Sequence, residues 1–360
     1  MAYISFQPSD FFKTLLYTGD AAVNSITGVG FTPNFVWFKG RSGSTSHQLY
    51  DTARGNDSAL VSSTTAAAID ATGDGFTSLD SDGYTFNGSG GGGNVNGSGT
   101  TYVAWNWKGG TTSIPSGGTI TPTAANYSAT AGFGIYLYTG TGSAGTIAHG
   151  LGATPTAIII KRYNTGGNSW AVYNKGHAGI GTDSADYVQA LNDNAAQSND
   201  ATYFNDTVPT STVFSVGSAN GSNGSVAPNG YVAYVFTNKR GFSHCGAYRG
   251  NSSSTDGPFV YCGFRPAFIM LKANAQTTNW MMFDDKREGF NVDNDPLYAD
   301  VDVAEGTADN LDIVSNGFKI RAGSGGGSVN EINTDGEYYS YIAFAEFPFV
   351  SSNSKAGTAR

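Results

Sequence analysis

The chain has 360 residues, among them 50 Gly, 20 Tyr and 22 Phe, and only 13% of its residues are charged. This composition is poor in helix formers and rich in strand and turn residues, so it predicts an all-β protein with little or no helix. The net charge of −9 and the scattered Lys and Arg residues argue against nucleic-acid binding. No run approaches the roughly 18 apolar residues of a membrane helix, and no leader pattern opens the chain, so we expect cytoplasmic synthesis without membrane insertion.

The N-terminal segment 1–16 is too apolar for a free tail. It carries four aromatic residues, which are Tyr3, Phe6, Phe11 and Phe12. Apolar side chains in this number need a covering surface. We therefore expect these aromatic residues to dock on a partner chain or on the first unit that follows.

One pattern then occurs three times: Tyr-x-Gly, a Gly-x-x-Pro, and a short apolar run that ends in Lys. Its prolines are Pro33, Pro155 and Pro266, at steps of 122 and 111 residues. Such a period is too long for a solenoid and predicts tandem domains. The apolar runs are continuous instead of alternating, which predicts strands that are covered on both faces by a second sheet and by a loop or neighbour.

Each repeat closes on a similar strand, preceded by a short aromatic strand. The closing motifs begin at Tyr102, Tyr231 and Tyr341, and the preceding strands are expected at 83–86, 212–216 and 317–320. Trp170 and Trp280 occupy the same position of the second and third repeats, which indicates a shared packing role. The pattern predicts three tandem paralogous β-sandwich, jelly-roll-like units.

The expected units span 17–110, 132–241 and 242–350, with a Thr/Ser/Gly/Pro linker at 111–131 and a C-terminal tail at 351–360. The linker predicts an independent first unit, while the other two should pack rigidly. The stretch 184–197 could form a short helix. Gly-rich tracts precede the closing strands and are expected to be surface loops, which either face a neighbour or are merely tolerated.

No arrangement typical of catalysis, cofactor binding or metal binding emerges. His47, His149, His177 and His244 are scattered and are expected at the surface or in turns. An acidic stretch, 293–312, lacks the spacing of a calcium loop and is expected to be solvated, although the question of calcium binding stays open. We therefore expect no catalytic, cofactor or metal residues.

The two cysteines, Cys245 and Cys262, are expected to face each other across a hairpin centred near Ser253. Two buried thiols are favoured in the cytoplasm, and a disulfide formed later outside the cell stays open. A single pair of cysteines lacks the further ligands that a zinc site requires.

A glycan depolymerase would require two carboxylates about 5–10 Å apart in a groove. Asp284 and Asp285 are the candidates. Asp51 and Asn174 stand at the position that matches Asp284, which favours a structural side chain that caps the strand end.

Four segments carry a family resemblance that covers nearly the whole chain. They are residues 6–19, 30–41, 102–108 and 343–353, with sequences such as Gly-Phe-Thr-Pro-Asn-Phe-Val-Trp-Phe-Lys and Tyr-Val-Ala-Trp-Asn-Trp-Lys. The chain resembles tail-fibre-like virion proteins of tailed phages, in particular of marine phages, in which a β domain of unknown function recurs. The second repeat departs most, with Ala157 and Ile159 in place of aromatic residues.

The resemblance implies a non-enzymatic structural protein on the outside of the virion. The expected role is a tail fibre or spike component that contacts the host surface, and the alternative is a head fibre or capsid decoration protein. Expected partners are other virion proteins, further copies of the chain in a homo-oligomer (a trimer by analogy), and a glycan or receptor of the host surface.

Overall fold

The computed structural model describes residues 6–70, 75–87, 95–179, 184–287, 291, 295–321 and 329–347. These residues form an all-β protein made of antiparallel sheets. The helical elements are single turns: η1 (Pro8–Asp10), η2 (Ser184–Asp186), α1 (Ala201–Phe204) and α2 (Val329–Ile332). The stretch 184–197 is therefore not the expected helix, because after η2 it continues as a strand.

Three large sheets share the order of five strands. The first has the order β1-β9-β3-β4-β5-β6, with strands Phe12–Thr18, Thr101–Trp107, Phe35–Gly40, Gln48–Asp51, Gly55–Leu60 and Ile69–Asp70. The second, β10-β11-β18-β13-β14-β15-β16, has strands Ala124–Ser128, Phe133–Thr139, Gly230–Thr237, Pro155–Arg162, Ala171–Asn174, Tyr187–Ala190 and Ser198–Asn199. The third, β19-β26-β21-β22-β23, has strands Ser243–Arg249, Tyr338–Phe344, Phe268–Ala273, Met281–Asp284 and Leu297–Tyr298. The shared strands are β1-β9-β3-β4-β5, β11-β18-β13-β14-β15 and β19-β26-β21-β22-β23.

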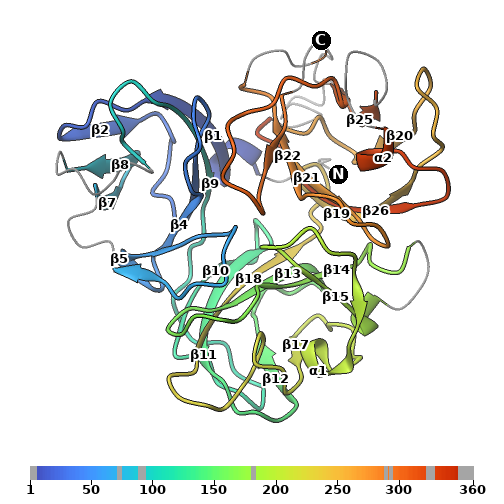
Figure 1. Cartoon of the computed structure of the whole chain (residues 1–360). Coiled ribbons are helices and arrows are strands. Elements are labelled where there is room, and N and C mark those ends of the chain that lie inside the picture. Colours follow the sequence, from blue (N-terminus) through green and yellow to red (C-terminus); the bar gives the residue numbers. More distant parts are fainter. Residues whose placement is uncertain are drawn as a thin grey trace.

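A small sheet accompanies each large one. These small sheets are β2-β8-β7 (Asn24–Thr27, Gly83–Phe86, Phe76–Asp80), β12-β17 (Gly145–Ala148, Val213–Val216) and β20-β25-β24 (Phe259–Tyr261, Gly317–Ile320, Leu311–Val314). The chain thus repeats one arrangement in a first segment (12–107), a second segment (124–237) and a third segment (243–344). Figure 1 shows the three as lobes around a common centre, coloured blue, green and orange to red.

The central strand of each large sheet is covered on both faces. All residues of β3, β13 and β21 are buried. In the first segment, Val36 and Phe38 pack toward the small sheet, while Phe35 and Trp37 join a core cluster that contains residues of all three segments. The expectation of doubly covered strands is confirmed, and the inner cover is the neighbouring large sheets.

The Tyr-x-Gly motif is explained by one packing arrangement that occurs three times. The Tyr ring stacks on a Tyr of the adjacent strand, in the pairs Tyr17–Tyr102, Tyr138–Tyr231 and Tyr248–Tyr339. Each motif Tyr also donates its hydroxyl to the carbonyl before a buried Asn, namely Asn96, Asn223 and Asn333. The motif Gly leaves room for the backbone that follows this Asn: a Cβ on Gly140 would lie 2.2 Å from the carbonyl oxygen of Gly224.

The strand register corrects one expected equivalence. The partner of Tyr248 is Tyr339, so Tyr339, and not Tyr341, corresponds to Tyr102 and Tyr231. The two-residue shift keeps the same face of the strand, and the local sequence Tyr-Tyr-Ser-Tyr does not distinguish the two registers.

The expected boundaries change in two places. Strand β1 begins at Phe12 and pairs with β9, so part of the segment 1–16 belongs to the first sheet. Strand β10 pairs with β11, so the expected linker 111–131 contains an edge strand of the second sheet. The expected independence of the first unit is wrong as well, because residues from all three segments share one core cluster. The first segment is therefore packed against the other two.

The cysteines do not face each other across a hairpin. Cys245 lies in β19, which pairs with β26, whereas Cys262 follows β20 in the small sheet. Both are free and buried, as favoured for the cytoplasm. Burial raises the pKa of the Cys245 thiol to about 12 and that of Cys262 further, so neither forms a thiolate readily.

Candidate functional site

Several buried polar groups of the described residues lie where one segment meets the next. The strand that follows each motif Lys, which is β4, β14 or β22, ends in an acid or amide that contacts the next segment. Trp105 Nε1 donates to Asp284 Oδ2 at 3.1 Å, and the Tyr234 hydroxyl donates to Asp51 Oδ2 at 2.7 Å. At the third junction Asn174 Nδ2 donates to the carbonyl of Tyr341 at 3.3 Å.

Whether a junction carries an aspartate or an asparagine depends on the residue that it faces in the next segment. Strand register places Ile342 at the position of Trp105 and Tyr234, and Ile342 has no donor. The facing residue there is Asn174 in place of an aspartate. A buried carboxylate requires donors, so aspartate occurs where a donor is present and asparagine where it is not.

An arginine three residues after each of these two aspartates forms an ion pair with it. Arg54 Nε lies 2.6 Å from Asp51 and Arg287 Nε lies 2.7 Å from Asp284, with all four side chains at most 2% exposed. The other aspartate oxygen caps the turn, because Asp284 Oδ1 accepts the backbone N–H groups of Lys286 and Arg287. The expectation that these positions hold structural capping side chains is confirmed by these bonds.

A second set of contacts uses the residues eight or nine positions after each Lys. Trp170 Nε1 donates to the carbonyl of Val61, and Trp280 Nε1 donates to that of Ala190. In the first segment His47 takes this position, and its Nε2 lies 2.7 Å from the carbonyl of Tyr298. Trp170 and Trp280 are fully buried, as expected for a shared packing role, and each contacts the neighbouring segment.

An arm from each segment extends to the next one. Ala68, Gln197 and Glu305 donate their backbone N–H to the carbonyls of Tyr163, Asn274 and Arg41, each two residues after the motif Lys. The first segment therefore contacts the second, the second contacts the third, and the third contacts the first. The segments form a closed, head-to-tail ring within one chain.

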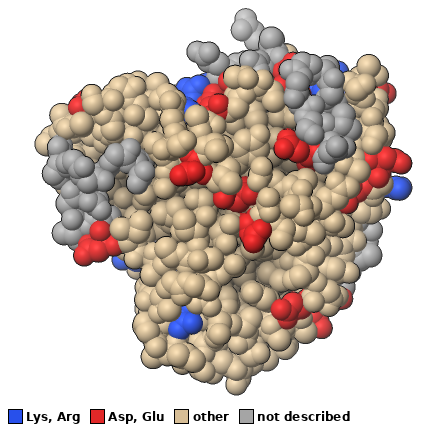
Figure 2. All heavy atoms as spheres, in the orientation of Figure 1, with Lys and Arg blue, Asp and Glu red and all other residues tan. Residues whose placement is uncertain are grey.

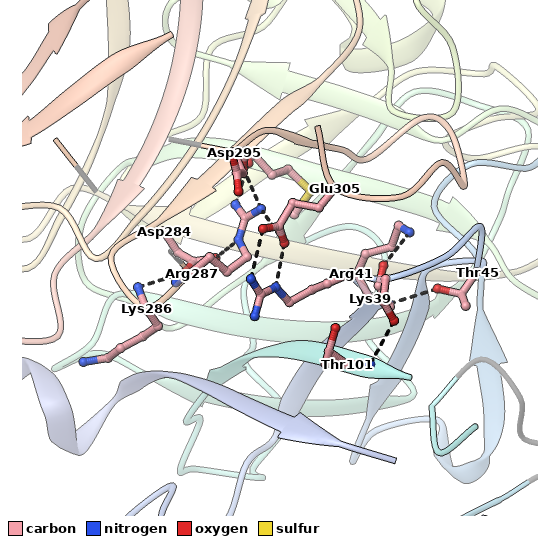
Figure 3. Close-up of polar contacts among 12 residues, drawn as sticks. Lys39, Arg41, Thr45, Thr101, Asp284, Lys286, Arg287, Asp295 and Glu305 are labelled. Atoms are coloured by element: carbon pink, nitrogen blue, oxygen red, sulfur yellow. Dashed lines mark hydrogen bonds and ion pairs between the residues drawn. The ribbon is translucent and has the colours of Figure 1, made fainter. Parts of the chain in front are cut away.

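The junction between the third and first segments carries the largest ionic network (Figure 3). Glu305 accepts two hydrogen bonds from Arg41, at 2.6 and 3.0 Å, and lies 3.5 Å from Arg287. Lys39 Nζ donates to the carbonyl of Val303 at 2.8 Å. Because this pair of segments lies far apart in sequence, the network ties the two ends of the ring together.

The three motif lysines are buried and hydrogen-bonded to carbonyl groups. Lys161 Nζ donates to Asn168 at 2.6 Å, and Lys272 Nζ donates to Thr278. Burial lowers the pKa of Lys39, Lys161 and Lys272 to about 8. A carbonyl partner compensates part of the cost of burying each ammonium group. Among these bonds, only that of Lys39 to Val303 crosses between segments, since Asn168 and Thr278 belong to the same segments as their lysines.

The expectation of surface or turn positions is wrong for His47 and His149, which are buried outside turns, whereas His177 is buried but lies in the turn after β14. His47, His149 and His177 are fully buried, and His244 is half-buried. Burial lowers the pKa of His47 to about 3 and that of His177 to about 4. His47 Nδ1 accepts a hydrogen bond from Trp37 Nε1, which leaves the Nε2 proton for Tyr298 and identifies the neutral tautomer.

These histidines predict a loss of stability in acid. The folded pKa of His177 is about 4 against about 6.5 when unfolded, so the unfolded chain binds more protons between these values, and the free energy of unfolding decreases as the pH is lowered through this range. From pH 7 to pH 5 we expect His177 to contribute about 2 kcal/mol of this loss. Urea unfolding at both pH values should show a smaller difference for His177→Gln than for the wild type. An unchanged difference would contradict this role.

The candidate carboxylates of a depolymerase are both engaged within the protein. The Asp284 side chain is fully buried between Arg287 and Trp105. Burial raises the pKa of Asp285, and its carboxylate lies 2.6 Å from Arg265. A substrate in solution therefore has no open path to the Asp284 oxygens.

The acidic stretch is divided among separate structural roles. Asp300 accepts from the Trp280 backbone, Glu305 binds Arg41, and Asp312 binds Arg321. Within the described residues, no group of three His, Cys, Asp or Glu side chains could hold a metal ion. Likewise, the described helices include none of the length and apolarity needed to cross a bilayer.

The aromatic residues of the N-terminal segment contact the third segment. Phe6 and Phe11 pack edge to face on Phe242, and the fully buried Phe12 stacks on Phe344. Phe12 also packs on Trp107, and Lys108 Nζ lies over the Phe11 ring, so the expected contacts with the first unit are present. The contacts with the third segment are an addition that the sequence did not predict. Tyr3 lies outside the described residues.

The remaining predicted residues belong to the repeated core. Pro33, Pro155 and Pro266 are buried at the entry to the central strands, and Tyr102, Tyr231 and Tyr341 are buried in the closing strands. Sequence reasoning missed the Asp-x-x-Arg pairs and the buried asparagines. The signal for the Asp-x-x-Arg pairs was the recurrence of Asp51, Asn174 and Asp284 at 12 or 13 residues after the motif Lys.

An apolar void lies at the centre of the ring. Side chains of all three segments line it, among them the equivalent residues Trp37, Ile159 and Met270. Its lining is entirely apolar, so it is a packing defect where three sheets converge. On the visible outer face in Figure 2, acidic side chains are spread widely and basic ones are few, in keeping with the net charge of −9.

Comparison with known proteins identifies a family to which the chain is similar. A family model described as a domain of unknown function, DUF7483, matches residues 7–348. No curated protein and no solved structure matches the chain. This family match spans all three segments, in agreement with a ring that is one structural unit.

Proposed function

The chain belongs to the DUF7483 family, a domain of unknown function, and we propose that it is a non-enzymatic structural protein of a phage virion, exposed on the particle as a tail fibre or spike component. The observation that supports this most is the closed ring. Buried polar groups from all three segments are used to join one segment to the next. Such a chain gains a rigid, preformed body without a partner or cofactor.

The surface composition also supports the proposal. Few charges and many Gly, Ser, Thr and Asn residues suit a body that stays soluble outside a cell. The engaged Asp284 and Asp285 carboxylates favour a structural role over a depolymerase. A protein of this kind contacts other virion proteins, and further copies of itself, through its outer faces.

The proposal is tested by locating the protein on purified virions. Antibody raised against the full chain is expected to label the tail or its appendages in immunogold electron microscopy, and mass spectrometry of the same virions should detect the chain. Label over the head would favour the alternative of a head fibre or decoration protein. Absence from virions, together with abundance in the lysate, would overturn a virion role.

A further inference from the structure

The outer face of the third small sheet carries two exposed aromatic side chains. Phe259 is 48% exposed and Tyr261 is 62% exposed, although both lie in the strand β20. The residue between them, Val260, is buried in the core of the third segment. The two rings therefore project on the same side of the strand, about 6.6 Å apart along it.

The other two segments show that the fold does not require aromatic residues here. Strand register places Ser25 and Thr27 at these positions in the first segment, and Thr146 and Ala148 in the second. The same small sheet is thus built with short side chains twice. Exposed aromatic residues cost solubility and gain nothing for folding, so their presence in the third segment alone points to a ligand.

The surroundings of the rings are polar and open. Lys319 lies across from Phe259, and Asp312 lies across from Lys319 on the next strand. Lys319 Nζ binds Asp256 at 2.5 Å, and Arg321 binds Asp312 at 2.5 Å. Charged donors and acceptors therefore border the apolar pair on one side.

A glycine leaves the other side of the pair uncovered. Gly317 lies across from Tyr261 and separates it from Val314. This position cannot carry a side chain, because a Cβ would lie 1.9 Å from the carbonyl oxygen of Val260. The Tyr261 ring therefore has no side chain directly across from it on the neighbouring strand, while Lys319 lies across from Phe259.

We propose that Phe259 and Tyr261 form a binding platform for a saccharide, a surface we call the aromatic platform. A pyranose ring has an apolar C–H face that packs on an aromatic ring, and a rim of hydroxyl groups that hydrogen-bonds to Lys319 and Asp312. A protein partner is less favoured, because a stable interface buries about 800 Å² on each side and two side chains supply only part of that. The source of the saccharide rests on the proposed function, since an external virion protein would meet the glycans of the host surface.

The test uses the full chain labelled with 3-fluorotyrosine, in which Tyr261→Thr identifies the ¹⁹F resonance of Tyr261. The probes are the methyl glycosides of glucose, galactose, mannose and N-acetylglucosamine at up to about 100 mM, because small ligands on open faces bind weakly. The Tyr261 resonance is expected to shift saturably with at least one of them and not with glycerol. Phe259→Ser, which copies the first segment, should raise the midpoint concentration several-fold. Ser25→Ala, at the same position of the first segment, should leave it unchanged.

Two results would overturn the aromatic platform. One is a Tyr261 resonance that none of the four glycosides moves. The other is a resonance that moves with protein concentration alone, which would make this face a contact between copies of the chain. A saccharide-dependent shift in a protein that is absent from virions would leave the platform standing and reject the virion role.

Discussion

Replacing Asp284 with Ala is expected to lower the free energy of unfolding by about 3–5 kcal/mol, because it leaves the buried Arg287 guanidinium with only the longer, 3.5 Å ion pair to Glu305. Arg287 is 2% exposed and cannot turn into solvent without breaking its bonds to the carbonyls of Met282 and Asp295. The same substitution removes the acceptor of Trp105 at the junction with the first segment. Urea denaturation followed by tryptophan fluorescence measures the loss.

An exposed ion pair of the same chain provides the matched control. Asp312 binds Arg321, which is 44% exposed, so Asp312→Ala should cost less than about 1 kcal/mol. The double variant Asp284→Asn with Arg287→His copies the Asn174 and His177 of the second segment and should be more stable than Asp284→Ala. Equal losses for Asp284→Ala and Asp312→Ala would show that the junction contributes little.

Replacing Gly140 with Ala is expected to cost about 3 kcal/mol or more, or to prevent folding. The added Cβ would lie 2.2 Å from the carbonyl oxygen of Gly224, a backbone atom that cannot rotate away. Gly19 and Gly250 have the same environment in the other segments, with Cβ contacts of 2.4 and 2.2 Å, so Ala should be comparably damaging there. Thermal unfolding of the three variants measures the effect.

Gly43→Ala is the control for this series. Nothing lies within 4 Å of a Cβ at Gly43, so its substitution should change the melting temperature little. A Gly140→Ala variant as stable as Gly43→Ala would refute the packing explanation of the Tyr-x-Gly motif.

The local structure was largely predictable from the sequence, because its signals are local. Continuous apolar runs predicted the central strands β3, β13 and β21, and the short aromatic strands β8, β17 and β25 appear where expected. The edge strand β10 was missed because Ala124–Ser128 has a weak, partly polar pattern. The equivalence of Tyr339 was missed because a shift by two residues preserves strand alternation.

The ring was not predictable in the same way, because it depends on which faces meet. His47 takes the place that Trp170 and Trp280 take in the other segments, and only the three-dimensional equivalence reveals this. The burial of His47 and His177 follows from tertiary contacts with no local signature. The aromatic platform also became visible only when Phe259 and Tyr261 could be compared with Ser25 and Thr27 at the same positions.

The head-to-tail closure has a consequence for synthesis. Arg41 and Glu305 meet across 264 residues of sequence, so the last junction closes only after most of the chain has left the ribosome. At typical elongation rates of about 5–20 residues per second, the first sheet waits on the order of tens of seconds with the apolar inner face around Trp37 uncovered. Exposure of this apolar face during synthesis should therefore limit the yield of native protein more than the stability of the finished ring does. A chaperone that covers the face should raise the yield.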